Sequence, residues 1–231
     1  MCDILMSEFK PIWDGLDWSV LTNALLSIIP ALICITFHEL SHGLVAYALG
    51  DNTAKRAGRL TLNPIRHIDI MGLISMAFLG FGWAKPVPVD MRKFKNPKTG
   101  MALVALAGPA SNLILAVIVL LLSTLMVKNA YTSDMWMEAW SVMQRMAYLS
   151  IALAIFNIIP IPPLDGSKVL FSFLSENMYY KLMRYERYGM IILLIVLWSG
   201  VFDTYMGGAA KHVYETLYNW VYGLYGTVVG L

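Results

Sequence analysis

Uncharged stretches of membrane-spanning length dominate the chain. Runs without a charged side chain cover residues 18–37, 70–84, 99–127, 146–164, 188–202 and 216–231. A helix needs about 20 consecutive apolar residues to cross a bilayer, so most of these runs predict membrane helices. The last run is rich in tyrosine and is expected to form either an interfacial helix or a short sixth span. The pattern predicts an all-α polytopic membrane protein with about five to six membrane helices or hairpins.

The second run, 70–84, is short for a full crossing and contains three glycines. It lies between two strongly basic segments, 51–67 and 85–98, and basic loops of membrane proteins stay on the cytoplasmic side. A full crossing would place these segments on opposite sides, so we expect 70–84 to form a re-entrant hairpin. The acidic N-terminus then lies outside, and the first span, 18–37, runs inward. The chain is expected to be a multi-pass protein of the cell's inner or plasma membrane.

Two loop segments alternate polar and apolar side chains in the manner of β-strands. They are residues 59–63 and 86–90, and the second contains prolines that suit an edge strand. If they pair, they form a small β-hairpin-like sheet at the cytoplasmic face, whose exposed edge could accept an extended peptide. Two irregular loops with solvated charges are an equally good interpretation.

The composition agrees with a membrane protein. Of the 231 residues, 58% are hydrophobic and 14% are charged, and the mean hydropathy is +0.62. These values are typical of polytopic membrane proteins and not of soluble domains. The 2 cysteines are too few for a disulfide framework or a thiolate zinc site. No linker or repeat divides the chain, so we expect a single integral-membrane domain, 1–231, that contacts the lipid bilayer and no nucleic acid.

An HExxH motif stands just after the first uncharged run. On a helix, His38 and His42 lie one turn apart on the same face, which suits two ligands of one zinc ion. Glu39 can take a proton from the water that such a metal activates. The alternative is a chance match with two histidines packed between helices. Because ionisable side chains at membrane depth are costly, they mark a functional site by default. We therefore interpret the motif as a metal site.

A catalytic zinc site needs a third protein ligand, and Asp165 is the candidate. It follows Asn157 and three prolines at 160, 162 and 163, which cannot continue a regular helix. Non-helical backbone at membrane depth is tolerated where protein or a water-filled cavity satisfies it, so Asp165 can point into such a cavity. The alternative for Asp165 is an N-cap of the following helix. Capping alone does not explain why Asn157 and the prolines cluster before it.

These motifs resemble those of a known family. The motif at 38–42 together with Asn157, the prolines and Asp165 is similar to the site-2 protease family of intramembrane zinc metalloproteases, over nearly the whole chain. Residues 108–112 resemble a further motif of that family. Residues 48–51 and 60–69 resemble its compact bacterial branch, which lacks added soluble domains.

The resemblance implies one Zn²⁺ per chain, bound by His38, His42 and Asp165, with Glu39 catalytic and Asn157 in contact with the substrate. Asn112 could orient a ligand imidazole, or it could make a packing hydrogen bond between helices. The implied reaction is hydrolysis of a peptide bond in or near a transmembrane segment of a membrane-protein substrate, at a site nearer the cytoplasmic side. Homo-oligomer formation stays open.

Two other functions fit parts of the pattern. A membrane protease of the prenyl-protein type also uses HExxH but takes a later glutamate as third ligand. The later glutamates are Glu138, Glu176, Glu186 and Glu215, which lie in loops or near helix ends. A metal transporter or a non-catalytic zinc-binding scaffold is the other alternative. Transport would need polar ligands that continue across the membrane, and the first span offers few of them.

Overall fold

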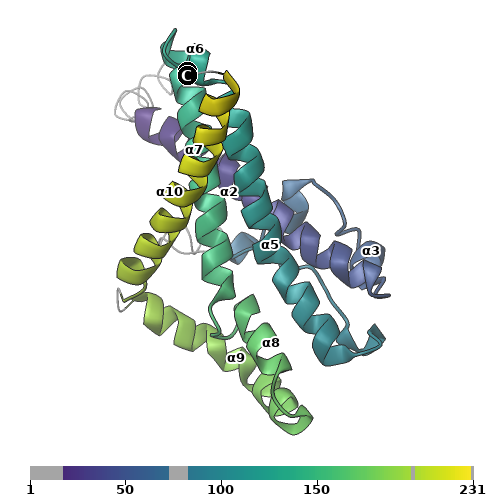
Figure 1. The fold of residues 1–231 in the computed structure, drawn as a ribbon. Coiled ribbons are helices and arrows are strands. Elements are labelled where there is room, and N and C mark those ends of the chain that lie inside the picture. The colour runs from purple at the N-terminus through teal and green to yellow at the C-terminus, as the bar shows by residue number, and fades with distance from the viewer. Residues whose placement is uncertain (1–17, 73–82, 199–200, 230–231) are drawn as a thin grey trace, which may run out of the picture.

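The computed structural model describes residues 18–72, 83–198 and 201–229, and these residues are mostly helical (Figure 1). The predicted re-entrant hairpin, 70–84, lies largely outside this part of the chain. The helices are α2 (Trp18–Ala48), α3 (Thr53–Arg56), α5 (Pro97–Thr124), α6 (Val127–Ala130), α7 (Asp134–Ile158), α8 (Asp165–Ser172), α9 (Glu176–Trp198) and α10 (Val201–Val229). Two short 3-10 helices, η1 (Pro64–His67) and η2 (Met91–Lys93), lie in the segment between α3 and α5.

Three of the described helices are long and apolar enough to cross a membrane, fewer than the five to six predicted. They are Ile28–Ala48 within α2, and the whole of α5 and α7. Helix α9 differs because its first half is charged, at Glu176, Lys181, Arg184, Glu186 and Arg187. Helix α10 carries charges as well and is less apolar than α5. The all-helical membrane architecture is therefore confirmed, whereas the number of spans is not.

Helix α5 is the centre of the bundle. It contacts α2, α7, α8 and α10, which come from widely separated parts of the chain. The core that these helices share contains Cys34, Leu115, Leu120, Ala147 and Val221, all buried. Small residues at such contacts let helix backbones approach closely, which is the main source of packing energy between membrane helices. The close approach at α5 also determines the geometry of the site described below.

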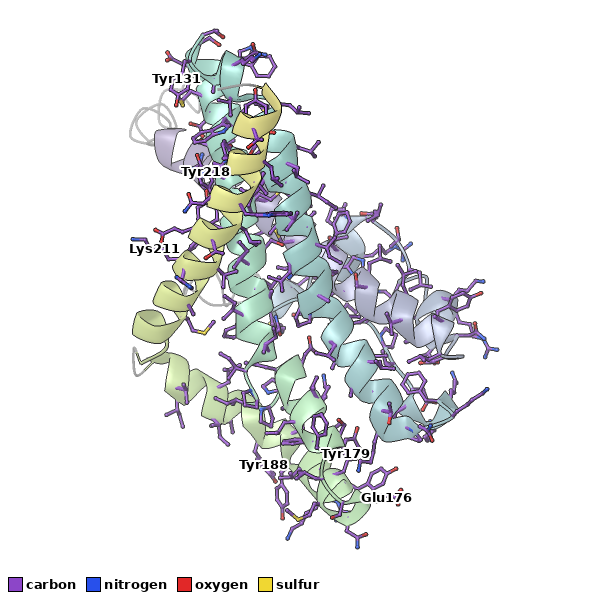
Figure 2. All side chains as sticks on the ribbon, in the orientation of Figure 1. Tyr131, Glu176, Tyr179, Tyr188, Lys211 and Tyr218 are labelled. Atoms are coloured by element: carbon purple, nitrogen blue, oxygen red, sulfur yellow. The ribbon has the colours of Figure 1, made fainter. Side chains whose placement is uncertain are left out.

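The C-terminal helix α10 runs beside α7, with Tyr218 on the half that lies against it and Lys211 further along (Figure 2). Tyr222 of α10 accepts hydrogen bonds from Trp140 Nε1 and Gln144 Nε2, both at 2.9 Å. Tyr214 donates to Gln144 Oε1 at 2.7 Å. The tyrosines of this helix therefore serve helix packing, in addition to any contact with the membrane interface.

The predicted sheet between 59–63 and 86–90 does not form in the described part of the chain. That part holds a single antiparallel bridge, between Ile68 and Ala84. The reason lies in the backbone donors: Val87 N–H and Asp90 N–H donate to side-chain carboxylates, and the neighbouring prolines have none. The side chain of Arg59 in the first segment instead reaches the residue before the second segment, where its Nη2 donates to Lys85 O at 2.6 Å. The irregular-loop interpretation is the correct one here.

Buried Asp51, just after α2, links the end of this helix to the loop before α5 through hydrogen bonds and an ion pair. Its carboxylate accepts hydrogen bonds from Asp90 N–H at 2.6 Å and from Thr53 N–H at 2.9 Å. Lys93 Nζ lies 3.0 Å from the same carboxylate. Burial raises the pKa of Asp51, but these hydrogen bonds outweigh it and lower the pKa to about 2. Asp51 therefore stabilises the fold as an anion.

We expect Asp51→Asn to lower the free energy of unfolding by roughly 2 kcal/mol at pH 7, since the folded pKa is below the unfolded value. The stabilisation by Asp51 is present above about pH 4 and is lost as the pH falls toward 2. Unfolding of the detergent-solubilised protein across this range should show the two variants converging at low pH. Asp134→Asn, at an exposed position, is the control. A gap between wild type and Asp51→Asn that stays constant down to pH 2 would contradict this account.

Candidate metal centre

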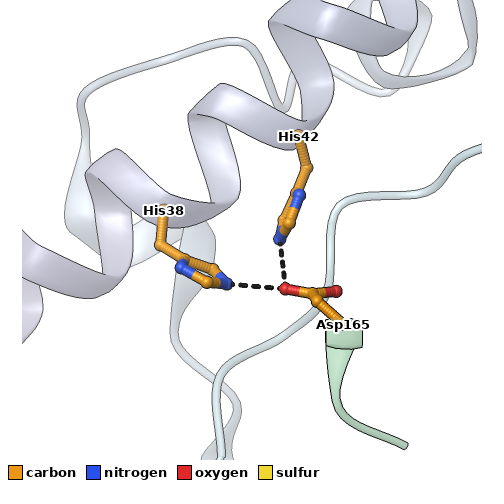
Figure 3. Close-up of side chains that lie close together, drawn as sticks. All are labelled: His38, His42 and Asp165. Carbon is orange, nitrogen blue, oxygen red and sulfur yellow. Dashed lines mark hydrogen bonds and ion pairs between the residues drawn. The ribbon is translucent and has the colours of Figure 1, made fainter. Parts of the chain in front are cut away.

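Three predicted ligands lie together although they are far apart in the sequence (Figure 3). Nε2 of His38 and Nε2 of His42 each lie 3.1 Å from Oδ2 of Asp165. All three side chains are buried, and one ligand atom from each lies within 4.8 Å of the others. A metal site needs at least three ligand side chains of the types His, Cys, Asp or Glu close together. Among the described residues, these three form the one group that meets this condition. Two imidazoles and a carboxylate are a donor set that suits zinc.

Local structure explains how the two stretches deliver these side chains. His38 and His42 occupy successive turns of α2, so their rings project from one face and stand edge to face, with centroids 4.6 Å apart. Helix α7 ends at Ile158 and α8 begins at Asp165, because the prolines between them interrupt the helix as predicted. The N-cap position of α8 is occupied by Leu164, and Asp165 is the first residue of the helix. The N-cap alternative for Asp165 is therefore wrong, and its carboxylate faces the histidines instead.

Each imidazole is held by a group on α5. Nδ1 of His42 lies 2.7 Å from the carbonyl oxygen of Val104, which can only accept, so Nδ1 carries the proton and Nε2 presents a lone pair. Nδ1 of His38 lies 3.3 Å from the amide of fully buried Asn112. Oδ1 of Asn112 has no partner among the described residues, and turning the amide by half a turn would direct it at His38 Nδ1–H. This position of Asn112 agrees with the predicted role of orienting an imidazole.

Glu39 lies at the same cavity as the ligands. The cavity has a volume of about 350 Å³ and is lined by the three ligands, Glu39 and Val87, among other residues. Val87 N–H donates to Oε2 of Glu39 at 2.8 Å, so the loop before α5 holds the carboxylate. Glu39 is thus fixed beside the place where a metal and its water would bind, as a general base requires.

Asn157 lines this cavity and also a second, mostly apolar one of about 580 Å³ that adjoins it. Its Nδ2 donates to Leu153 O of its own helix at 2.9 Å. Buried His67 lines the second cavity, and its Nε2 lies 3.0 Å from Thr61 O.

Sequence reasoning missed three contacts of the site: the Val104 carbonyl, the Val87 N–H and the side chain of Lys168. The first two are backbone groups, which carry no residue-type signal. Lys168 lies 3.6 Å from Asp165 Oδ1. Its spacing of three residues from Asp165 would have placed it on the same helix face, had the start of α8 been predicted.

Comparisons with known proteins identify the family of the chain. The model of Peptidase family M50 matches residues 124–199, which include Asn157 and Asp165. YwhC of Bacillus subtilis, whose name describes it as a candidate zinc metalloprotease, is 42% identical over 174 residues, or 73% of this chain and 78% of that protein. The chain belongs to peptidase family M50. This result confirms the resemblance to site-2 proteases that the motifs indicated.

Other members are more distant. Rip2 of Mycolicibacterium smegmatis, also named as a candidate zinc metalloprotease, is 28% identical over 171 residues, 72% of this chain and 64% of that protein. A zinc metalloprotease of Methanocaldococcus jannaschii is 24% identical over 167 residues, 72% of this chain and 38% of that protein. No solved structure matches the chain significantly. The zinc cofactor predicted from the motif thus agrees with the names of these M50 relatives and with the His-His-Asp group.

Gly108 of α5 allows the central helix to touch both ligand rings. A Cβ at this position would lie 2.5 Å from Cε1 of His38 and 2.5 Å from Cε1 of His42. Real Cβ atoms essentially never approach carbon this closely, so the rings would have to move. Glycine at 108 is therefore required by the close packing of α5 against the metal centre.

We expect Gly108→Ala to lower zinc affinity about 10–100-fold, the usual result of disturbing the groups that orient metal ligands. Titration of the purified protein against a zinc chelator measures the effect. Gly207→Ala is the matched control, because a Cβ at 207 meets no atom within 4 Å. Equal zinc affinity in both variants and wild type would show that α5 does not constrain the rings.

Proposed function

We propose that this M50 protein is an intramembrane zinc endopeptidase that cleaves membrane-protein substrates in or near a transmembrane segment, as in regulated intramembrane proteolysis. The observation that carries the proposal is the convergence of His38 Nε2 and His42 Nε2 on Asp165 Oδ2, beside Glu39 and at the edge of an apolar cavity. His38, His42 and Asp165 would hold one zinc ion. The cavity would admit part of an apolar substrate.

Bound zinc would supply an acidified water and a Lewis acid for the scissile carbonyl. Glu39 would take the proton from the water and return it to the leaving amine, held meanwhile by Val87 N–H. The Val104 carbonyl and Asn112 would keep the two imidazoles in the orientation that directs Nε2 at the metal. Asn157 would give up its bond to Leu153 O and donate to the substrate backbone.

The substrate must reach this site in an extended form, because a helix hides its carbonyls in its own hydrogen bonds. The apolar cavity is lined by Ile28, Leu32 and Ile35 of α2 and by Phe156 of α7, which suits a segment that leaves the lipid phase. Pro86 lines both the metal cavity and the apolar cavity, and Val87 lines the metal cavity. We infer that substrates with helix-breaking residues near the cleavage point are preferred, since they unwind at lower cost.

The membrane orientation follows from charge. The basic segments 51–67 and 85–98 lie between His42 and Asp165 in the sequence, and both contribute residues to the lining of the two cavities. Their charge favours a site nearer the cytoplasmic side of the cell membrane. The proposal treats residues 1–231 as one membrane-embedded catalytic domain that acts on transmembrane proteins.

The rival functions gain no specific support. Of the later glutamates, Glu186 lines the metal cavity, but its carboxylate lies 3.8 Å from Lys168 Nζ and Asp165 is the acid that faces the histidines. For transport, the hydroxyls of Thr36 and Ser41 on α2 both bond to carbonyls of their own helix. They do not form the start of a relay of ligands.

We expect Glu39→Gln to retain zinc and to lower the cleavage rate of a reconstituted transmembrane substrate by about 100-fold or more, because general-base catalysis supplies about that factor. Zinc content and cleavage are measured on the same preparation in lipid vesicles. Glu215→Gln, at an exposed position on α10, is the control and should cut at the wild-type rate. A Glu39→Gln variant that cuts at the wild-type rate would refute the role of Glu39.

A further inference from the structure

Lys168 stands beside the candidate metal centre, one turn after Asp165 on α8. Its ammonium lies 3.6 Å from Asp165 Oδ1, and the Lys168 side chain is only 19% exposed. A lysine ammonium with this little exposure loses part of its hydration. Its position therefore has a cost that the Asp165 ion pair offsets.

The two oxygens of Asp165 have different partners. Oδ2 faces Nε2 of both histidines at 3.1 Å, whereas Oδ1 faces Lys168. A carboxylate that offers both oxygens to a metal fills two coordination positions, and one that offers a single oxygen fills one. A carboxylate that binds through one oxygen leaves a coordination position free, and a catalytic zinc site needs that position for water. The ion pair with Lys168 keeps Oδ1 turned away from the histidines.

Lys168 is itself held from the neighbouring helix. Glu186 of α9 places Oε1 3.8 Å from its Nζ. Helix α9 can approach because Gly189 packs directly on the Pro162 backbone, where a Cβ would lie 2.5 Å from the Pro162 carbonyl oxygen. Figure 2 shows α8 and α9 at one end of the molecule, joined by a turn near Glu176. The ion pairs thus run from α9 through Lys168 to Asp165.

We propose that Lys168 is a positioning residue of the metal centre: it holds Oδ1 of Asp165, so that the carboxylate presents Oδ2 alone to the metal and leaves a position for water. Glu186 keeps the Lys168 ammonium in place. This inference rests on the proposed function only in that a divalent metal binds His38, His42 and Asp165.

The test uses Lys168→Met, which keeps the length of the side chain and removes its charge, in the full-length protein loaded with Co²⁺. Cobalt reports coordination number through its visible absorption, which is intense for four ligands and weak for five or six. We expect wild type to show the intense spectrum and Lys168→Met to show a weaker one, because the freed Oδ1 joins the coordination. With zinc, kcat should fall about 10–100-fold with KM unchanged, the usual loss when the partner of a metal ligand is removed.

Lys168→Arg retains the cation and should restore the spectrum and kcat, and Lys211→Met on exposed α10 should match wild type. Glu186→Gln leaves Asp165 and Lys168 intact and should show the same spectral change to a smaller degree, which keeps the test open if Lys168→Met does not fold. Wild-type spectra and kcat in both Lys168→Met and Glu186→Gln would overturn the role of Lys168. If the Co²⁺ spectrum of Asp165→Ala were the same as that of wild type, the proposed metal site itself would be overturned.

Discussion

The negative charge of the buried Asp165 carboxylate must be compensated by neighbouring groups, and the structure depends on this. Asp165 lies between two buried imidazoles in a helical bundle, where an ionised side chain without partners would cost several kcal/mol. A divalent metal bound between the three side chains would remove this cost, because it would neutralise the anion and use the imidazole lone pairs. The same compensation explains why the histidines and the aspartate must lie at one depth. The helices that carry them, α2 and α8, are therefore placed by chemistry as well as by packing.

Helix α5 makes this arrangement possible without supplying a ligand. It gives the Val104 carbonyl and Asn112 to the two imidazoles, and Gly108 lets its backbone touch both rings. Ser150 of α7 donates to the carbonyl of Asn112 at 2.8 Å, which connects the helix before the proline break to the same turn of α5. Because α5 contacts α2, α7, α8 and α10, it connects the packing of these four helices to the metal centre.

Much of the site could be predicted because it rests on local rules. The spacing of His38 and His42 needs only a helix, and the prolines before Asp165 predict a break that the structure has between Ile158 and Asp165. The uncharged run at 99–127 nearly coincides with α5. Other helices extend beyond their uncharged runs: α7 begins at Asp134 and α9 at Glu176, because a helix continues where its side chains leave the apolar phase. The uncharged runs therefore predicted where the helices lie better than they predicted where the helices begin and end.

The remaining features depend on contacts between distant segments. The alternation of polar and apolar residues at 59–63 and 86–90 predicted two strands. The backbone N–H groups of the second segment that a sheet would use instead donate to the carboxylates of Glu39 and Asp51. Backbone groups such as Val87 N–H and Val104 O leave no trace in the residue types, so only packing reveals their role. Lys168 looks like an ordinary helix residue until α9 brings Glu186 to it. Tertiary contacts thus determine the surroundings of the candidate ligands, whereas the candidate ligands themselves could be predicted from the sequence.

The most direct measurement is zinc K-edge X-ray absorption of the purified protein and of Asp165→Ala. The account predicts one zinc per wild-type chain with two imidazole nitrogens and a carboxylate oxygen among its nearest neighbours, and loss of that oxygen or of the metal in the variant. A zinc with a sulfur neighbour, or one whose neighbours are the same in both proteins, would contradict it.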